Sequence, residues 1–136
     1  MANTHTGRCA CGKVSYEISG DPARMMNCHC EDCRRAGGSG YAALLVFPKD
    51  AVTLTGELRY YAVTSEAGSI VERGFCPACG SPVAGRLSRN PGVVVIQAGS
   101  LDDPSLHRPA VNLWTGNSPA WDHLDPGIPH FAKGAT

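Results

Sequence analysis

This sequence has no excess of either charge and no long hydrophobic run. Twelve lysines and arginines balance twelve aspartates and glutamates, so the formal net charge is zero. Such a balance argues against nucleic acid or a membrane surface as the partner, because both attract strongly basic proteins. The longest apolar runs, residues 41–47 and 93–96, are far shorter than the roughly 20 residues that span a bilayer. These absences argue against a nucleic-acid-binding or membrane-spanning protein.

The sequence also lacks a recognisable secretory signal, a linker, an internal repeat and a low-complexity tract. Its first seven residues contain no basic head followed by an apolar stretch, which predicts a cytoplasmic protein. A length of 136 residues predicts one domain. We expect its core to cover about residues 7–122 and the remaining tail, which contains proline and glycine, to be irregular coil.

Polar and apolar residues alternate with a period of two through much of the chain, as over residues 13–19. This pattern predicts a mainly β fold of short strands with little helix. Further strands are expected at residues 41–47, 52–55, 58–63, 69–75, 82–87, 93–98 and 111–114. One helical turn is expected at residues 31–36, where two glycines would end it. Exposed strand edges in such a fold would allow a homodimer.

Seven cysteines fall into three close groups. They form a C-x-C pair, a C-x-C-x-x-C segment and a C-x-x-C pair, at Cys9 and Cys11, at Cys28, Cys30 and Cys33, and at Cys76 and Cys79. In a reducing compartment such clusters are more often metal ligands than disulfides. Disulfides are the alternative, but an odd count and the strained ring of a C-x-C bridge suit them poorly. Seven thiols divide into four, which close a tetrahedral zinc site, and three, which leave one position free.

The closed site is expected to hold a structural zinc ion through Cys9, Cys11, Cys76 and Cys79. The first pair precedes a predicted strand and the second pair follows one, so the metal would join the start of the chain to its middle. Pro77 restricts the backbone of the second turn, and Gly80 permits left-handed geometry there. Gly12 would serve the first turn in the same way. The alternative is a set of free or buried thiols in unrelated turns.

The open site is expected to hold a second zinc ion through Cys28, Cys30 and Cys33. An open zinc–thiolate site attracts soft ligands, so an incoming thiol would bind as its thiolate. Three thiolates also weaken the Lewis acidity of the metal, which favours thiol or thiohemiacetal substrates over ordinary amides and esters. The alternative is a second structural zinc completed by a histidine, with His5, His107, His123 and His130 as candidates. His29 is expected to point away from the metal, either behind the ligands or at the surface.

The residues beside the triplet suit a substrate that carries a negative charge. Arg34 and Arg35 follow Cys33 directly, and guanidinium groups bind carboxylates well. Ser39 lies in a glycine-rich turn whose backbone a ligand could approach closely. We therefore predict that Arg34, Arg35 and Ser39 contact the substrate. The alternative is that the arginines are solvated surface charges.

With these residues in view, the sequence resembles the glutathione-dependent formaldehyde-activating enzyme family, which also includes the centromere protein V domain. The resemblance covers nearly the whole chain and lies in residues 9–16, 28–35, 38–39, 68–69, 73–81, 98–103 and 119–121. It implies a mainly β, Mss4-like fold of the β-tent type with two zinc ions. By position, it implies structural ligands at Cys9, Cys11, Cys76 and Cys79 and catalytic ligands at Cys28, Cys30 and Cys33. It also implies a carbon–sulfur lyase that joins or splits formaldehyde and glutathione through S-hydroxymethylglutathione.

Three functions follow from the residues and the resemblance together. The first is a cytoplasmic zinc enzyme of the carbon–sulfur lyase type that acts on a thiol adduct of a small aldehyde. The second is a zinc-dependent binding module that catalyses nothing and in which both metals are structural. The third is a metal or redox handler whose three-cysteine segment is the exchangeable site. The sequence identifies neither the physiological thiol nor the group that carries the proton.

Overall fold

The computed structural model describes residues 3–134 of the chain. Within these residues the protein is mainly β, with ten strands, one α-helix and four short 3₁₀ helices. The strands are β1 (Thr4–Arg8), β2 (Ser15–Ser19), β3 (Arg24–Cys28), β4 (Ala42–Pro48), β5 (Val52–Thr55), β6 (Arg59–Thr64), β7 (Ile70–Phe75), β8 (Pro82–Leu87), β9 (Val93–Gln97) and β10 (Asn112–Leu113). The helices are α1 (Glu31–Gly37), η1 (Lys49–Ala51), η2 (Ala98–Ser100), η3 (Pro104–Leu106) and η4 (Thr115–Asn117). None of the described helices has the length and apolar character needed to cross a membrane.

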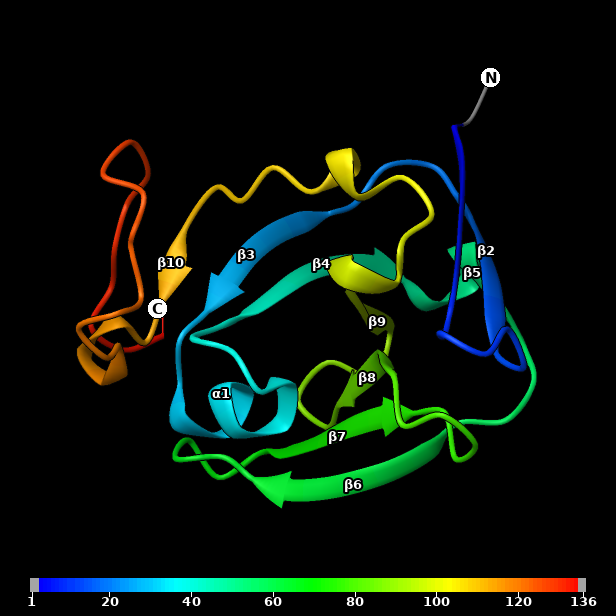
Figure 1. The fold of residues 1–136 in the computed structure, drawn as a ribbon, viewed down its shortest axis with the longest axis horizontal. Coiled ribbons are helices and arrows are strands. Elements are labelled where there is room, and N and C mark those ends of the chain that lie inside the picture. Colours follow the sequence, from blue (N-terminus) through cyan, green and yellow to red (C-terminus); the bar gives the residue numbers. More distant parts are fainter. Residues whose placement is uncertain (1–2, 135–136) are drawn as a thin grey trace.

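The strands form two sheets, and the larger one bends around the helix. The smaller sheet has the order β1-β2-β5, and the larger has the order β10-β3-β4-β9-β8-β7-β6. All pairings are antiparallel except that of β10 with β3. Figure 1 shows β3 and β4 on one side of α1 and β6 and β7 on the other. The curvature therefore brings strands that are distant in the sheet order to the same helix.

The main core is formed by residues from both sheets. Tyr16 and Ile18 of β2 pack in one cluster with Leu45 and Phe47 of β4 and Ile96 of β9. Each of these side chains is almost completely removed from solvent. Burying an aliphatic or aromatic side chain stabilises a protein by about 1.5–3 kcal/mol. The alternation of buried and exposed residues along β2 confirms the period of two that predicted this strand.

Two strands, β1 and β3, were not predicted, because neither has a clear apolar alternation. β1 pairs along its length with β2, and Gly7 allows a close approach: a Cβ at Gly7 would lie 2.2 Å from Tyr16 Oη. β3 contains two methionines and no β-branched residue, yet it pairs along its length with β4. Tertiary pairing thus overrides a weak local preference in both strands. The strand expected at residues 111–114 is shorter than predicted and consists of Asn112–Leu113.

Replacing Gly56 with alanine is expected to lower the free energy of unfolding by about 2–4 kcal/mol. Gly56 has a φ of +90°, and a Cβ there would lie 2.2 Å from the carbonyl oxygen of Lys13. Gly20 is the matched control, because its φ is +85° but a Cβ there would have no neighbour within 4 Å. Gly20→Ala should therefore cost only the backbone strain, about 1–2 kcal/mol. Urea denaturation of both variants measures the difference, and equal losses would contradict a tight contact at Gly56.

Candidate metal centres

Two turns with similar hydrogen bonds carry the four-cysteine cluster of Cys9, Cys11, Cys76 and Cys79. The first turn joins β1 to β2 and the second joins β7 to β8. The backbone N–H of Gly12 donates to the carbonyl of Cys9 at 3.2 Å, and that of Gly80 donates to the carbonyl of Cys76 at 2.8 Å. The φ angles of Gly12 and Gly80 are +81° and +78°. The left-handed geometry predicted for both glycines is confirmed.

The sulfur atoms of this cluster have the spacing of a tetrahedral metal site. All four lie within 4.8 Å of one another. The Sγ atoms of Cys9 and Cys11 are 3.6 Å apart, and those of Cys11 and Cys76 are 3.8 Å apart. Zinc–sulfur bonds of about 2.3 Å in a tetrahedron place the sulfurs about 3.8 Å apart, whereas a disulfide bond is about 2.05 Å long. The donor set and its geometry therefore fit a zinc ion, and none of the seven cysteines is paired in a disulfide.

The surroundings of the cluster stabilise some of its thiolates but not all of them. The hydroxyl and the backbone N–H of Ser81 lower the pKa of Cys79 to about 5. A backbone N–H from Lys13 acts to lower the pKa of Cys11, but partial loss of hydration and hydrogen bonds with the three neighbouring thiols outweigh it and raise this pKa to about 11. Four adjacent negative charges repel one another strongly without a cation among them. A divalent cation would allow all four sulfurs to ionise.

The second group, called the triplet, consists of Cys28, Cys30 and Cys33 and lies where β3 passes into α1. Cys28 ends β3, Cys30 caps the N-terminus of α1, and Cys33 lies in the first turn of the helix. The Sγ atom of Cys30 accepts a hydrogen bond from the backbone N–H of Cys33 at 3.3 Å. All three sulfurs lie within 4.8 Å of one another. The helix ends at Gly38, whose φ is +72°, as the sequence predicted.

No fourth ligand joins the triplet among residues 3–134, because no histidine, carboxylate or other cysteine lies within the same 4.8 Å of its sulfurs. His107 instead bonds through Nε2 to Asn27 Oδ1 at 2.9 Å, and His130 bonds through Nε2 to the carbonyl of Asp125 at 2.7 Å. The remaining candidates, His5 and His123, are also absent from the group. A metal ion bound there would therefore have three protein ligands and would leave one position for another ligand.

One sulfur of the triplet is strongly acidic. Hydrogen bonds from the thiols of Cys28 and Cys33 lower the pKa of Cys30 to about 2, and the positive charge of Arg73 acts in the same direction. The hydrogen bonds of Cys28 with Cys30 and with Cys33 raise the pKa of Cys28 far above its ordinary value. The neighbouring thiols therefore favour ionisation of Cys30 and disfavour that of Cys28. A thiolate is the form in which cysteine binds metal.

Among the described residues outside the triplet, Arg73 is the only one whose charged side chain donates a hydrogen bond to a triplet sulfur. It lies on β7, and its Nη2 donates to Cys33 Sγ at 3.4 Å. Burial acts to lower the pKa of Arg73, but the bond to Cys33 and the charges of Cys33, Cys30 and Asp32 outweigh it and raise the pKa. Sequence reasoning did not identify Arg73 as a site residue. The contact depends on the curvature of the larger sheet, which cannot be predicted from the local sequence around Arg73.

Of the two positions expected for His29, behind the ligands or at the surface, the structure shows the first, because the side chain is buried behind the triplet. Its side chain is 1% exposed. Nδ1 lies 2.5 Å from Asp122 Oδ2, and Nε2 lies 2.8 Å from Asn112 Oδ1. Its backbone N–H donates to Leu113 at 2.8 Å, and its ring lies 5.0 Å from that of Tyr41. His29 therefore ties β10 and the C-terminal segment to the turn between the first two triplet cysteines.

Replacing Asp122 with alanine is expected to lower the free energy of unfolding by about 2–4 kcal/mol, because it leaves a buried histidine nitrogen without its partner. The side chains of His29 and Asp122 are 1% and 3% exposed. Asp50→Ala is the matched control, since Asp50 is exposed in η1. Thermal or urea unfolding measures both. A loss of less than about 0.5 kcal/mol for Asp122→Ala, the range of ordinary surface changes, would contradict this role.

The residues predicted to contact the substrate lie on or just after α1. Arg34 and Arg35 each place Nη2 near Glu31 Oε1, at 3.9 and 3.6 Å. The side chain of Arg35 is 68% exposed and that of Arg34 is 33% exposed. The hydroxyl of Ser39 donates to the carbonyl of Tyr41 at 3.0 Å. Their role in substrate binding stays a prediction, and the exposure favours Arg34 over Arg35 as a residue of a defined site.

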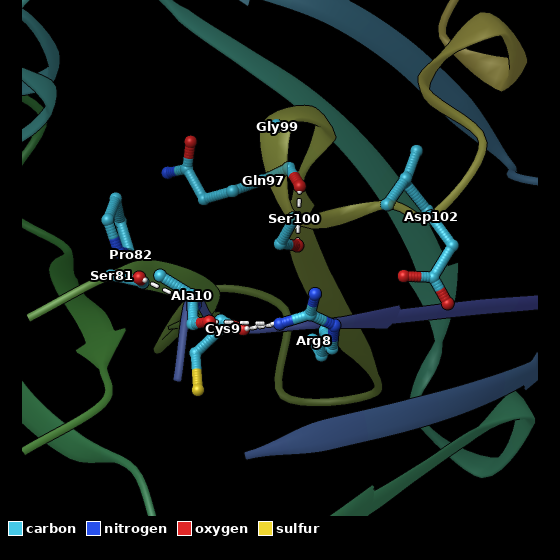
Figure 2. Close-up of a pocket in the computed structure, with 10 residues that line it drawn as sticks. Arg8, Cys9, Ala10, Ser81, Pro82, Gln97, Gly99, Ser100 and Asp102 are labelled. Atoms are coloured by element: carbon cyan, nitrogen blue, oxygen red, sulfur yellow. Dashed lines mark hydrogen bonds between the residues drawn. The ribbon is translucent and has the colours of Figure 1, made fainter. Parts of the chain in front are cut away.

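A cavity of about 490 Å³ lies beside the four-cysteine cluster (Figure 2). Its lining includes residues of the first turn, of the start of β8 and of the η2 region, namely Arg8, Cys9, Ala10, Ser81, Pro82, Gln97, Gly99, Ser100, Leu101 and Asp102. Nη1 of Arg8 donates to the carbonyls of Cys9 and Ala10, both at 2.9 Å. The guanidinium thus supports the backbone of the first turn. No triplet residue lines this cavity, so chemistry at the triplet does not take place in it.

Comparison with known proteins identifies the family of this chain. The family model of the glutathione-dependent formaldehyde-activating enzyme matches residues 4–117. The chain therefore belongs to the glutathione-dependent formaldehyde-activating enzyme family, whose fold is Mss4-like.

Similar proteins include curated relatives that bear the name of this family. One from Penicillium rubens is 28% identical over 82 residues, which cover 60% of this chain and 42% of the relative. One from Fusarium vanettenii is 26% identical over 82 residues, which cover 60% of this chain and 44% of the relative. The chain thus matches less than half the length of either relative. A Rhodobacter sphaeroides protein of known crystal structure superposes with a TM-score of 0.58 at 18% identity, covering 93% of this chain and 99% of that one, which shows a shared fold.

Proposed function

We propose that this protein is a zinc-dependent carbon–sulfur lyase that acts on a thiol adduct of a small aldehyde. S-Hydroxymethylglutathione is the substrate to test first, because the family is named for glutathione and formaldehyde. The single observation that carries the proposal is the triplet: three sulfurs converge and, among residues 3–134, no fourth protein ligand accompanies them. Structural zinc sites are closed by four protein ligands, whereas catalytic sites keep one position for substrate.

The proposal assigns one zinc ion to each cluster. In the four-cysteine cluster, Cys9, Cys11, Cys76 and Cys79 would hold a structural ion. In the triplet, Cys28, Cys30 and Cys33 would hold a catalytic ion. Zinc at the triplet would supply a Lewis-acidic position that favours a thiolate over a thiol. The seven unpaired cysteines suit a reducing, cytoplasmic compartment, which is part of the proposal.

The reaction joins or splits one carbon–sulfur bond. In the forward direction the sulfur of the thiol loses its proton and bonds to the carbonyl carbon of formaldehyde, and the carbonyl oxygen gains a proton. The reverse direction breaks the same bond and returns both fragments. The chain would orient the thiol through charges on α1, where Arg34 is the candidate for a carboxylate of the substrate. His29 does not carry the proton, because both of its ring nitrogens are engaged in the protein interior.

Exchange NMR with formaldehyde and a panel of thiols tests the proposal. Glutathione, cysteine and 2-mercaptoethanol each form a hydroxymethyl adduct, and the exchange rate between adduct and free aldehyde can be measured with and without protein. We expect the zinc-loaded protein to accelerate exchange with at least one anionic thiol. The same rate with and without protein for every thiol would refute the lyase.

Metal counting separates the lyase from the binding module. The proposal expects two zinc ions per chain, of which mild chelation removes only the triplet ion while the protein stays folded. If both ions resist chelation equally and no thiol is turned over, the non-catalytic module with two structural metals is the better description. If no zinc is bound at the triplet, both the zinc-dependent lyase and the binding module with two structural zinc ions are refuted.

A further inference from the structure

The guanidinium of Arg73 is half-buried, and among residues 3–134 it forms no ion pair with a carboxylate within 4.0 Å. Its neighbour on the same strand, Glu72, is instead paired with Arg86 at 2.9 Å. The side-chain hydrogen bond of Arg73 goes to Cys33 Sγ at 3.4 Å. Removing a charge from water is costly unless an opposite charge lies close to it. A triplet sulfur is thus the hydrogen-bond partner of the Arg73 side chain, and the nearby carboxylate of Asp32 contributes a further negative charge.

The contact uses only part of the donor capacity of the arginine. A guanidinium carries five N–H groups in a fixed planar arrangement. One of the terminal nitrogens, Nη2, is directed to Cys33. Arg73 reaches the triplet from β7, whereas the three sulfurs come from the end of β3, the N-cap of α1 and its first turn. Figure 1 shows β3 and β7 on opposite sides of α1. The positive charge therefore approaches the sulfurs from a different part of the fold and remains able to act on a ligand beside them.

The charge balance of a metal-loaded triplet depends on this arginine. Three thiolates and one divalent cation leave one net negative charge. A fourth ligand that is neutral leaves this charge unchanged, whereas a thiolate raises it to two. A second negative charge in a half-buried site is unfavourable unless a cation lies within a few ångströms. Arg73 is such a cation, and the hydrogen bond to Cys33 places it beside the ligand set.

We propose that Arg73 is the residue that makes the triplet select an anionic thiolate over a neutral ligand at its free position. The proposal deepens the lyase function, on which it rests, and defines the substrate class as thiols that bind in the ionised form and release their proton to solvent. Arg73 is a specificity-determining residue because it acts through charge next to the ligand. Arg73→Lys would keep the charge but lose the hydrogen bond from the planar guanidinium to sulfur.

Ligand titration of a cobalt-loaded triplet tests this role without measuring turnover. Co²⁺ in the triplet, with Zn²⁺ in the four-cysteine cluster, gives an absorption spectrum that changes when a fourth ligand binds. The two probes are 2-mercaptoethanol, which binds as a thiolate, and imidazole, which binds neutral. In Arg73→Met we expect the dissociation constant of 2-mercaptoethanol to rise about tenfold or more, which equals about 1.4 kcal/mol, and that of imidazole to change less than about twofold.

Two further variants complete the design. Arg86→Met is the matched control, because it removes the same charge from the neighbouring strand β8 without contact to the triplet, and it should leave both constants unchanged. Arg73→Lys should restore part of the preference for the thiolate. If Arg73→Met does not fold, Arg73→Gln removes the charge while keeping N–H donors and carries the same comparison.

Each outcome decides the proposal. Equal weakening of both ligands would assign Arg73 a structural role, and no change in either would remove it from the site; both results overturn the proposal. The proposal is supported if Arg73→Met binds 2-mercaptoethanol more weakly than the wild type does but binds imidazole equally well. A protein that turns over thiol adducts but shows no Arg73 effect would keep the lyase and reject only this inference. Failure of Co²⁺ to bind the triplet would overturn the lyase and the inference together.

Discussion

Cys76→Ser is expected to abolish cooperative unfolding, and the variant should be insoluble or lack a folded baseline. Cys76 is fully buried in the main core at the turn between β7 and β8. Structural zinc sites contribute about 10–16 kcal/mol of apparent binding energy in small zinc peptides, whereas whole domains are stable by about 5–15 kcal/mol. Loss of one ligand would remove much of this contribution. Circular dichroism, thermal melting and zinc content of purified protein measure the result.

A second variant separates the loss of metal from the damage to the core. Serine at position 76 would also bury a hydroxyl group, which is unfavourable by itself. Cys11 belongs to the same cluster but is exposed, so Cys11→Ser removes a ligand without that cost. We expect Cys11→Ser to lose one zinc ion and several kcal/mol of stability. If Cys11→Ser melts like the wild type while Cys76→Ser unfolds, packing rather than a metal holds this part of the fold.

The cysteine spacing was sufficient to predict how the sulfurs are grouped. The four-cysteine cluster joins two turns that are more than sixty residues apart in the sequence, and it forms as expected. The reason is chemical: a close pair of cysteines followed by a glycine forms a turn that presents both sulfurs on one side, and two such turns complete a ligand set. Gly12 and Gly80 have the required left-handed backbone. Local sequence therefore determines most of this cluster.

The surroundings of the triplet could not be predicted in the same way. Arg73 contacts Cys33 across forty positions of sequence, and Asp122 contacts His29 across 93. Neither contact has a periodic pattern or a spacing rule behind it. Both depend on the curvature of the larger sheet and on the path of the segment after β10. The family resemblance includes residues 73–81, which contain Arg73, and residues 119–121, which directly precede Asp122. It assigned no role to the side chain of either Arg73 or Asp122.

The strands show the same division between local and tertiary information. Strands with β-branched and aromatic alternation, such as β2 and β5, were predicted within about two residues at each end. β3 carries the first triplet cysteine at its end, yet its sequence of two methionines and an asparagine has little strand preference. Pairing with β4 on one side and β10 on the other supplies its geometry. The strand that positions the proposed reaction centre is thus specified mainly by its neighbours.

Cys30→Ser is expected to leave the fold intact and to lower turnover of the thiol–aldehyde adduct by at least about 10³-fold. Metal catalysis contributes several kcal/mol of transition-state stabilisation, and each 1.4 kcal/mol is a factor of ten in rate. Cys30 is half-buried and caps α1 by accepting the N–H of Cys33. Serine is a favoured N-cap residue whose hydroxyl oxygen can accept the same hydrogen bond. The helix should therefore survive a change that removes the most acidic sulfur of the triplet.

Cys30→Ser and Cys11→Ser together assign a different role to each metal. Cys30→Ser should contain one zinc ion, melt within a few degrees of the wild type and show no exchange rate above that of the buffer. Cys11→Ser should also contain one zinc ion but be strongly destabilised. If Cys30→Ser kept the wild-type exchange rate, the acidic sulfur would not be part of the reaction centre. If it instead unfolded like the Cys11 variant, the triplet would be a second structural site, because loss of one sulfur would then cost the fold rather than the chemistry.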